Sequence, residues 1–265
     1  MMTLRHARPG TPLDQFVELL WLCDMPPQPW AQERLLPGGS SELVVDLAEP
    51  SHAGVLSGPH AHFFLLETTR RQCLAGVHFR PGGAFAFIEP PLHELQDSVV
   101  PLEDLWGGVA RELRERLGEA QSDGERFSII EAVLLAQARN GLQRHPAVRY
   151  ALRAFMRVPC AHSVAGVAAQ VGLSQRRFTE CFTNEVGLTP KVFCRIRRFQ
   201  AAIQQVHRTG RTDWSALALD CGYFDQAHFI HDFRSFAGVT PTAYQSARTP
   251  FQNHVKFLQS ENAGA

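Results

Sequence analysis

The chain of 265 residues carries 26 Lys and Arg against 26 Asp and Glu, and 45% of its residues are hydrophobic. This composition is typical of a folded globular protein and excludes the collagen-like, disordered and disulfide-scaffold classes. No stretch approaches the roughly 18 consecutive apolar residues that a membrane-spanning helix needs. The first residues lack the apolar run of a secretory leader, so we expect a cytoplasmic protein with no membrane partner.

The zero net charge conceals an uneven distribution. Residues 1–144 contain 12 basic and 19 acidic residues, whereas residues 145–265 contain 14 basic and 7 acidic residues. An asymmetry of this kind indicates that the C-terminal half meets a polyanion, with chance clustering as the alternative.

The six cysteines are scattered and form no Cys-x-x-Cys pair, which argues against a zinc knuckle or a disulfide framework. Most of them are expected to be small core residues, and no cofactor is predicted. They are Cys23, Cys73, Cys160, Cys181, Cys194 and Cys221.

The first hundred residues predict a β-rich sandwich or barrel. Apolar runs of strand length occupy residues 16–22, 42–47, 54–57, 63–66 and 73–80, and Pro- and Gly-rich turns separate them.

After Pro101 the hydrophobic period changes to that of amphipathic helices, expected over 104–118, 125–140 and 147–156. No strand is predicted after residue 159. We therefore expect an α+β chain with a β-rich sensor or dimerisation domain over 1–144, a linking helix over 145–158, and an all-α domain over 159–265.

The strongest pattern in the sequence is an internal repeat in the basic half. Residues 163–193 and 213–244 align with an offset of 50 in their first part and 51 in their second. The matched positions of the first copy are Val164, Val167, Ala168, Val171, Gly172, Ser174, Phe178, Phe182, Gly187, Thr189, Pro190 and Phe193, and those of the second are Trp214, Leu217, Ala218, Cys221, Gly222, Asp225, Phe229, Phe233, Gly238, Thr240, Pro241 and Tyr244. Helical solenoids also repeat at this length, but they need about three or more copies.

Each copy predicts a helix-turn-helix. A short amphipathic helix ends at Gly172 or Gly222, and Ser174 or Asp225 then supplies the side-chain oxygen that caps the next helix. The N-terminal end of that next helix is the part that such motifs insert into the major groove of DNA.

Helical geometry separates a docking side from an outward side on both of these reading helices. The docking residues are Phe178, Cys181, Phe182 and Glu185 in the first copy and Phe229, Phe233 and Phe236 in the second. The outward residues are Arg176, Thr179, Glu180 and Thr183 in the first, and Ala227, His228, His231 and Ser235 in the second, with Gln226 projecting from the first turn.

Between the copies, apolar residues at alternating steps of four and three predict one continuous helix over residues 190–207. This length corresponds to about 27 Å, and successive major grooves on one face of DNA are about 34 Å apart. We therefore expect a rod that places both reading helices in adjacent grooves of one duplex. Arginines on or near the rod would contact the phosphates between them; they are Arg195, Arg197, Arg198 and Arg208.

Residues 160–247 resemble the AraC/XylS family of bacterial transcription regulators, whose DNA-binding domain has two helix-turn-helix units joined by a long helix. The resemblance rests on the run from Gly222 to Phe229, on Phe233-Arg234, and on the run from Gly238 to Tyr244. It implies a sequence-specific regulator, an activator or a repressor, that binds promoter DNA. The residues expected at the DNA are Ser174, Gln175, Arg176, Arg177, Thr179, Glu180, Thr183, Arg195, Asp225, Gln226, Ala227, His228, His231 and Arg234. The chain departs from the family pattern at His231, where relatives often carry Arg, and at Thr179 and Glu180.

The N-terminal half resembles the sensor-like domain of one branch of such regulators. The shared segments are residues 34–39, 76–83 and 99–107. The resemblance leaves open whether an effector exists and what it is. A homodimer is expected through the helices after residue 101, and RNA polymerase is a further expected partner.

Four residues of the N-terminal half are candidates for a ligand site: His60, His62, His78 and Arg80. The pattern His60-x-His62 with Glu67 resembles the metal ligands of cupin barrels, but surface residues are the simpler reading, and no metal is predicted. Arg80 and the backbone N–H groups of the glycine turn after it could bind a carboxylate or other anion. The alternative is a structural turn with Arg80 in an internal ion pair.

Other roles remain open from the sequence. Glu180 could accept a hydrogen bond from cytosine or hold Arg176 or Arg177 in place. The chain lacks the common nucleophile-elbow, phosphate-loop and zinc-protease motifs, so no enzyme is predicted. The alternatives are an enzyme or ligand-binding protein with an accessory DNA-binding module, and an N-terminal half that serves only as an interaction surface.

Overall fold

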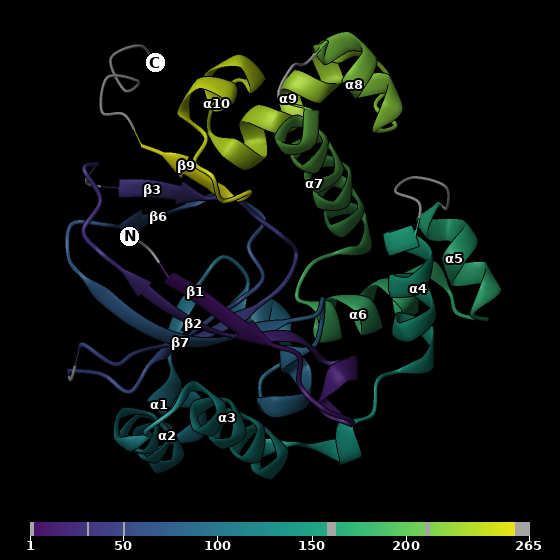
Figure 1. The fold of residues 1–265 in the computed structure, drawn as a ribbon. Coiled ribbons are helices and arrows are strands. Elements are labelled where there is room, and N and C mark those ends of the chain that lie inside the picture. Colours follow the sequence, from purple (N-terminus) through teal and green to yellow (C-terminus); the bar gives the residue numbers. More distant parts are fainter. Residues whose placement is uncertain (1–2, 31, 50, 158–162, 210–212, 258–265) are drawn as a thin grey trace.

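A computed structural model describes residues 3–30, 32–49, 51–157, 163–209 and 213–257. Figure 1 shows the strands on one side of the molecule and the helices after residue 146 on the other. No helix in these ranges combines the length and apolar character needed to cross a membrane. The predicted α+β class, with a β-rich part followed by a helical part, is confirmed.

The main sheet has six antiparallel strands in the order β1-β2-β7-β4-β5-β8. In chain order they are β1 (Thr3–Ala7), β2 (Val17–Met25), β4 (Glu42–Asp46), β5 (Val55–Ser57), β7 (Gln72–Phe79) and β8 (Val99–Pro101). The five predicted apolar runs all contain strands, whereas β1, β8 and the short β3 (Gln32–Leu35) were not predicted.

Three helices cover this sheet and close its core: α1 (Leu102–Trp106), α2 (Gly108–Glu119) and α3 (Asp123–Gln137). The prediction of one helix over 104–118 was wrong, because the chain breaks at Gly107 with φ 57° and starts again. Leu113 and Leu117 of α2 and Leu134 of α3 are buried against the sheet. Four short 3₁₀ segments complete this part of the chain: η1 (Leu13–Gln15), η2 (Ala84–Phe87), η3 (Leu92–Leu95) and η4 (Asn140–Leu142).

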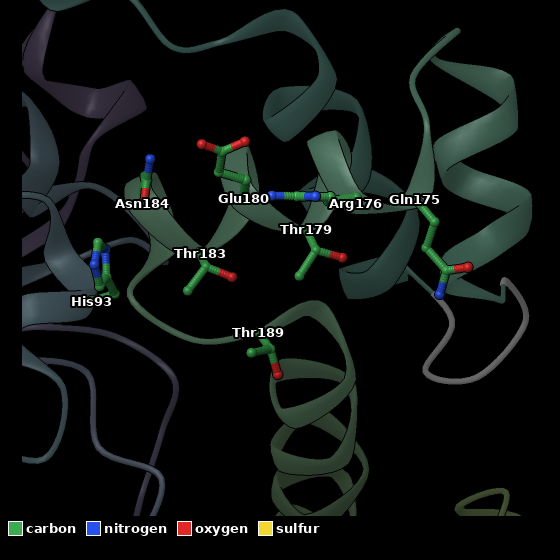
Figure 2. Close-up of a pocket in the computed structure, with 8 residues that line it drawn as sticks. All are labelled: His93, Gln175, Arg176, Thr179, Glu180, Thr183, Asn184 and Thr189. Carbon is green, nitrogen blue, oxygen red and sulfur yellow. The ribbon is translucent and has the colours of Figure 1, made fainter.

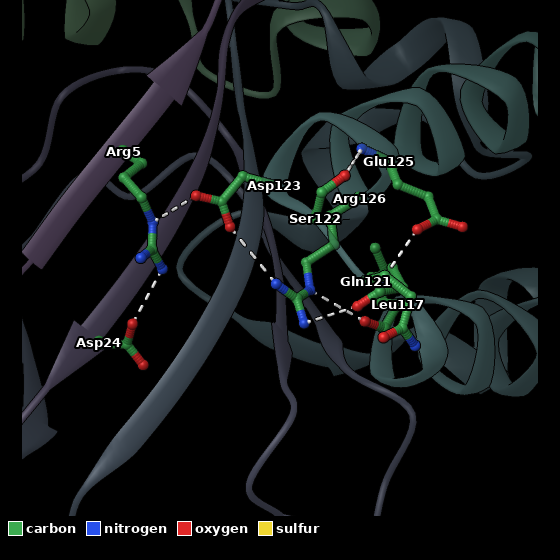
Figure 3. Close-up of polar contacts among 9 residues, drawn as sticks. Arg5, Asp24, Leu117, Gln121, Ser122, Asp123, Glu125 and Arg126 are labelled. Carbon is green, nitrogen blue, oxygen red and sulfur yellow. Dashed lines mark hydrogen bonds and ion pairs between the residues drawn. The ribbon is translucent and has the colours of Figure 1, made fainter.

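Polar contacts fix the start of α3 against the edge of the sheet (Figure 3). The Ser122 hydroxyl accepts a hydrogen bond from the backbone N–H of Glu125 at 3.2 Å, which caps the helix. Arg5 of strand β1 contacts both Asp24 of β2, at 2.9 Å, and Asp123 of α3, at 3.1 Å. The edge strand is therefore tied to its neighbour and to the helix layer.

A second sheet has three strands in the order β6-β3-β9 and pairs a strand that follows the last helix with two strands of the β-rich part. Its strands are β3 (Gln32–Leu35), β6 (Phe64–Glu67) and β9 (His254–Lys256). The expectation of no strand after residue 159 was wrong, since β9 follows the last helix and pairs antiparallel with β3. Beside this pairing the His254 ring contacts the buried Glu33 carboxylate at 2.8 Å.

The helical part consists of seven helices within the described residues. They are α4 (Pro146–Arg157), α5 (Val164–Gln170), α6 (Gln175–Val186), α7 (Pro190–Thr209), α8 (Trp214–Asp220), α9 (Gln226–Ala237) and α10 (Pro241–Ala247). Their core also contains Leu36 and Ala61 of the β-rich part and Val255 of β9. The helical part is therefore packed directly on the β-rich part.

Within the described part of the chain the cysteines form no disulfide. Cys23 and Cys221 are buried, and Cys73, Cys181 and Cys194 are half-buried. Cys160 lies outside the described residues.

Shortening Val255 tests the contribution of β9. The side chain is fully buried, so Val255→Ala removes two methyl groups from the core and is expected to lower the free energy of unfolding by about 2 kcal/mol. Chemical denaturation measures the change. Thr242→Ala, at an exposed position of α10, is the control and is expected to change stability by less than about 0.5 kcal/mol. Equal stability of both variants would show that β9 does not hold the two parts together.

Candidate nucleic-acid interface

The first helix-turn-helix unit consists of α5, a turn and α6. Ser163 caps α5 by accepting a hydrogen bond from the Gly166 N–H at 3.0 Å, and the turn passes through Gly172 at φ 70°. The Ser174 hydroxyl then caps α6 by accepting from the Arg177 N–H at 3.2 Å. The predicted caps and the left-handed glycine are therefore present, and they set the direction in which α6 starts.

The two faces of α6 differ as predicted. Phe178 and Phe182 are fully buried, and Glu185 is buried beside them. The opposite face borders an open hollow (Figure 2), which is lined by Gln175, Arg176, Thr179, Glu180, Thr183 and Asn184 of α6 together with Thr189 and His93. His93 belongs to η3 of the β-rich part and lies near Asn184, at the C-terminal end of α6, whereas Gln175 lies at the other end of the hollow. The N-terminal end of the helix is thus open to a partner.

The charged residues at the start of α6 divide into one paired and one free arginine. Arg177 contacts the Glu180 carboxylate at 3.0 Å on the exposed surface, so Glu180 has the holding role that the sequence left open, in this state of the protein. Arg176 is exposed and makes no ion pair within the described residues. Its guanidinium is a charged donor group on this face that is available to a ligand.

The second unit repeats this construction with α8 and α9. Asp213 caps α8, Gly222 makes the turn at φ 77°, and Asp225 caps α9 by accepting from the His228 N–H at 2.7 Å. Phe229, Phe233 and Phe236 are buried as predicted, while Gln226, Ala227, His231 and Arg234 are exposed. The side-chain oxygen of Gln226 accepts a hydrogen bond from Ser215 at 2.9 Å, which ties the start of α9 to α8.

His228 lies at the border of this exposed face. Its ring stands edge-on to Tyr223, with ring centroids 5.3 Å apart, and its Nε2 is 3.9 Å from the buried Asp232 carboxylate. Among the described residues no three groups of metal-binding type come together, here or elsewhere.

The helix α7 joins the two units as one continuous element of 20 residues, slightly longer than predicted. At 1.5 Å per residue it is about 30 Å long. Figure 1 shows the first unit at one end of α7 and the second unit at the other.

Arg195 of α7 is turned toward α9. Its Nη2 lies 2.7 Å and its Nε 3.2 Å from Oδ1 of Asp232, whose side chain is almost fully buried, and its guanidinium covers the ring of Phe236 at 5.1 Å. These contacts hold the second reading helix on the rod. The phosphate contact predicted for Arg195 would need the same guanidinium that is already paired with Asp232.

The other three arginines predicted on or near the rod differ in exposure and contacts. Arg198 lies over the ring of Tyr223 at 5.1 Å, and burial lowers the pKa of Arg197, with the Glu18 charge acting in the opposite direction. Arg208 is exposed near the end of α7.

Each of the four candidate ligand residues of the β-rich part has a partner within the protein. His60 is buried, stacks on Phe64 with ring centroids 4.3 Å apart, and its Nε2 is 2.9 Å from the Ser57 hydroxyl. Burial lowers the pKa of His60. The ring of His62 is largely exposed and lies 3.5 Å from the Asp97 carboxylate. Each of the two histidines therefore has a partner within the protein, Ser57 for His60 and Asp97 for His62.

His78 and Arg80 lie on a different strand and its exit. Burial alone would lower the pKa of His78, but the hydrogen bond to Glu42, at 2.7 Å, and the charges of Glu42 and Glu18 raise it. Arg80 donates from its Nε to the backbone oxygen of Asp14 at 2.9 Å.

The C-terminal end of α6 is anchored on the β-rich part. The buried Glu185 carboxylate lies 3.2 Å from the Arg144 guanidinium and accepts the His145 N–H at 3.0 Å. Gly187, with φ 83°, ends the helix where a Cβ atom would meet Pro59 at 2.3 Å and the carbonyl oxygen of Leu92 at 2.9 Å. Sequence reasoning placed Glu185 on the docking side but gave no sign of its partner Arg144, or of His93, because both come from other parts of the chain.

The Glu185 contact predicts a specific pH dependence. Burial raises the pKa of Glu185 from 4.5 to about 7, against the lowering effects of Arg144 and the His145 N–H. The folded state therefore binds this proton more tightly than the unfolded state, and the resulting stabilisation is complete below pH 4.5 and lost as the pH rises through 7. Glu185→Gln is expected to remove this part of the slope of stability against pH.

Thermal melts of both proteins between about pH 5 and 8 measure the difference. The slope is compared rather than the level, because the substitution also leaves Arg144 without its partner at every pH. Glu180→Gln, which removes an exposed carboxylate of the same helix, is expected to leave the slope as in the parent. Parallel curves for the parent and Glu185→Gln would contradict the raised pKa.

Two family descriptions match the chain. One, "Helix-turn-helix domain", covers residues 167–247, and the other, "Domain of unknown function (DUF6597)", covers residues 5–101. The first spans both reading helices and the rod between them. Residues 167–247 belong to the AraC-type helix-turn-helix family. The resemblance seen in the sequence is thereby confirmed for this domain.

Two curated relatives align with about a third of this chain. The "Probable transcriptional regulator LumQ" of Photobacterium leiognathi is 31% identical over 83 residues, which are 31% of this chain and 33% of the relative. The "HTH-type transcriptional regulator Rv1931c" of Mycobacterium tuberculosis is 31% identical over 87 residues, which are 33% of each chain. The alignment thus spans about a third of the length of these relatives.

Among solved structures, ToxT from Vibrio cholerae aligns with a TM-score of 0.42 and 10% identity over 93% of this chain and 97% of that chain. A DNA-binding transcriptional dual regulator from Escherichia coli K-12 aligns with a TM-score of 0.34 and 25% identity, over 41% of this chain and 96% of that chain.

Proposed function

We propose that the protein is a sequence-specific DNA-binding transcription regulator that acts by binding rather than by catalysis. The observation that carries the proposal is the pair of capped reading helices, each held by buried phenylalanines and each presenting an exposed face that starts at its N-terminal end. The names of the two relatives support the same class.

In the proposed binding mode, α6 and α9 enter adjacent major grooves of one duplex. The length of α7, about 30 Å, is close to the groove spacing of about 34 Å. The predicted contact residues keep their places in this proposal, with the exception of Arg195, for which we propose the structural role described above. The excess of basic residues after residue 145 would supply nonspecific attraction to the phosphates.

Selection of duplexes from a randomised pool by the full chain tests this function. Fluorescence anisotropy then compares the selected duplex with a scrambled one at physiological salt. We expect the selected duplex to bind at least about a thousandfold more tightly, as specific regulators do. Equal affinity for both duplexes would contradict sequence-specific regulation.

The finer parts of the proposal concern partners. We propose that the target is promoter DNA and that the protein activates transcription through contact with RNA polymerase. We further propose that the protein is located in the cytoplasm and forms a homodimer through the β-rich part. An effector of unknown identity would act on that part. Two chains joined in this way would bind two sites with an increased effective concentration. Sedimentation velocity at micromolar concentration distinguishes the homodimer from a monomer.

A further inference from the structure

The α6 residues that line the hollow identify, through the internal repeat, the residues of α9 that occupy the equivalent positions. Both helices have 12 residues, start one residue after their caps Ser174 and Asp225, and correspond at an offset of 51. The α6 residues that line the hollow therefore correspond, in order, to Gln226, Ala227, Ile230, His231, Arg234 and Ser235 of α9. This correspondence adds Ile230 to the outward face, a residue that the sequence analysis did not include.

The exposed faces of α6 and α9 differ in chemistry at two equivalent positions. Where α6 has Arg176 and Thr179, α9 has Ala227 and Ile230, which lie three residues apart and therefore side by side on the helix. Ala227 is exposed, and Ile230 is half-buried at the edge of the core. The second reading helix thus presents an apolar strip where the first presents hydrogen-bonding groups.

The turn before α9 adds a large apolar side chain to the same end of the helix. Phe224 comes directly before the cap Asp225, at the position where the second copy of the repeat has its extra residue. It is 87% exposed, more than any other large hydrophobic residue within the described ranges. An exposed phenylalanine next to the end of a reading helix has a natural apolar partner in the major groove, the 5-methyl group of thymine.

We propose that the second reading helix recognises thymine methyl groups, through Phe224, Ala227 and Ile230, while the first recognises hydrogen-bonding base edges through Arg176. The inference rests on the proposed DNA-binding function and assigns a different base preference to each half of the site. A guanine in the first half suits the fork of Arg176, and thymines in the second half suit the apolar strip. The operator would accordingly be asymmetric, and one chain would bind it in one orientation.

Replacement of thymine by 2′-deoxyuridine tests this, because uracil lacks only the 5-methyl group. The duplex selected by the full chain is synthesised with uracil either in the half-site that α9 protects or in the half-site that α6 protects. The two half-sites are identified by footprinting with the Arg176→Ala variant, which should lose protection in the α6 half-site. We expect each methyl group removed from the α9 half to weaken binding about fourfold, and removals from the α6 half to change it less than about twofold. A selected α9 half without thymine, or an equal effect in both halves, would overturn the proposal.

Variants of α9 separate a direct methyl contact from an effect of uracil on the shape of DNA. Ile230→Thr, which installs the residue type of Thr179, and Phe224→Ala are both expected to reduce the uracil penalty of the α9 half by at least about twofold. Leu219→Ala removes another exposed hydrophobic residue of the same unit, 64% exposed on α8, and is expected to keep the full penalty. The same penalty in all variants would overturn the proposal.

Failure of this inference can be distinguished from failure of the proposed function. If no duplex is preferred, the proposed function fails. If a duplex is preferred but carries no methyl dependence in its second half, the function stands and this inference fails.

Discussion

The Arg195→Ala variant is expected to lose about 3–5 kcal/mol of folding stability. The substitution would leave the Asp232 carboxylate, 1% exposed, without the guanidinium that contacts it at 2.7 Å. In a chain of this size the loss corresponds to a drop in Tm on the order of 10 °C. Differential scanning calorimetry measures it.

A double variant separates the ion pair from the size of the side chains. Arg195→Met with Asp232→Leu replaces both charged groups by apolar groups of similar volume, and it is expected to recover most of the stability that Arg195→Ala removes. If Arg195→Ala melts within about a degree of the parent, the pair does not hold α9 on α7 as described.

The same double variant decides between the two roles considered for Arg195. The affinity for DNA depends on salt, and the slope of that dependence falls by about one for each phosphate that the protein no longer neutralises. Because Arg195 is engaged with Asp232, we expect the folded double variant to keep the salt slope of the parent. A salt slope smaller by about one in the double variant would instead support the phosphate contact that the sequence predicted for Arg195.

The second large effect is expected at Arg176. Arg176→Ala removes the free guanidinium of the first reading face and is expected to weaken binding to the preferred duplex by about 1–3 kcal/mol, or roughly 5- to 150-fold. Because the side chain is exposed, the fold should be unaffected. Fluorescence anisotropy with the selected and scrambled duplexes gives both affinities.

Two further substitutions make this prediction specific. Arg176→Lys keeps the charge but loses the planar fork, so it should lose preference for the selected duplex while keeping affinity for the scrambled one. Arg177→Ala removes the neighbouring arginine, which is paired with Glu180, and should cost less preference than Arg176→Ala. Equal losses from both alanine substitutions would indicate general attraction to phosphates rather than base reading.

The parts of the structure that could be predicted from the sequence are those with local signals. The caps at Ser174 and Asp225 and the left-handed glycines at the two turns specify their conformations within a few residues. The rod was predictable because its apolar period extends over many turns. A repeated motif also shows each signal twice.

The parts that could not be predicted depend on contacts between distant segments. Strand β9 has three residues, too few for a periodic pattern, and exists because β3, more than 200 residues earlier in the chain, supplies its partner. Arg195 resembled the other rod arginines in sequence, and its distinction is the buried Asp232 of another helix. Ile230 was missed because isoleucine is apolar, as docking residues are, and its side chain is partly buried against the core.

The most direct test of the central claim, two reading helices held at a fixed spacing on one face of DNA, is the insertion of base pairs between the two halves of the selected site. Five inserted base pairs turn the second half to the opposite side of the duplex, since one helical turn takes about 10 base pairs. A single α7 helix of 20 residues cannot follow that rotation, so we expect the affinity to fall to that of a duplex with one half-site. An affinity unchanged by the insertion would contradict the account.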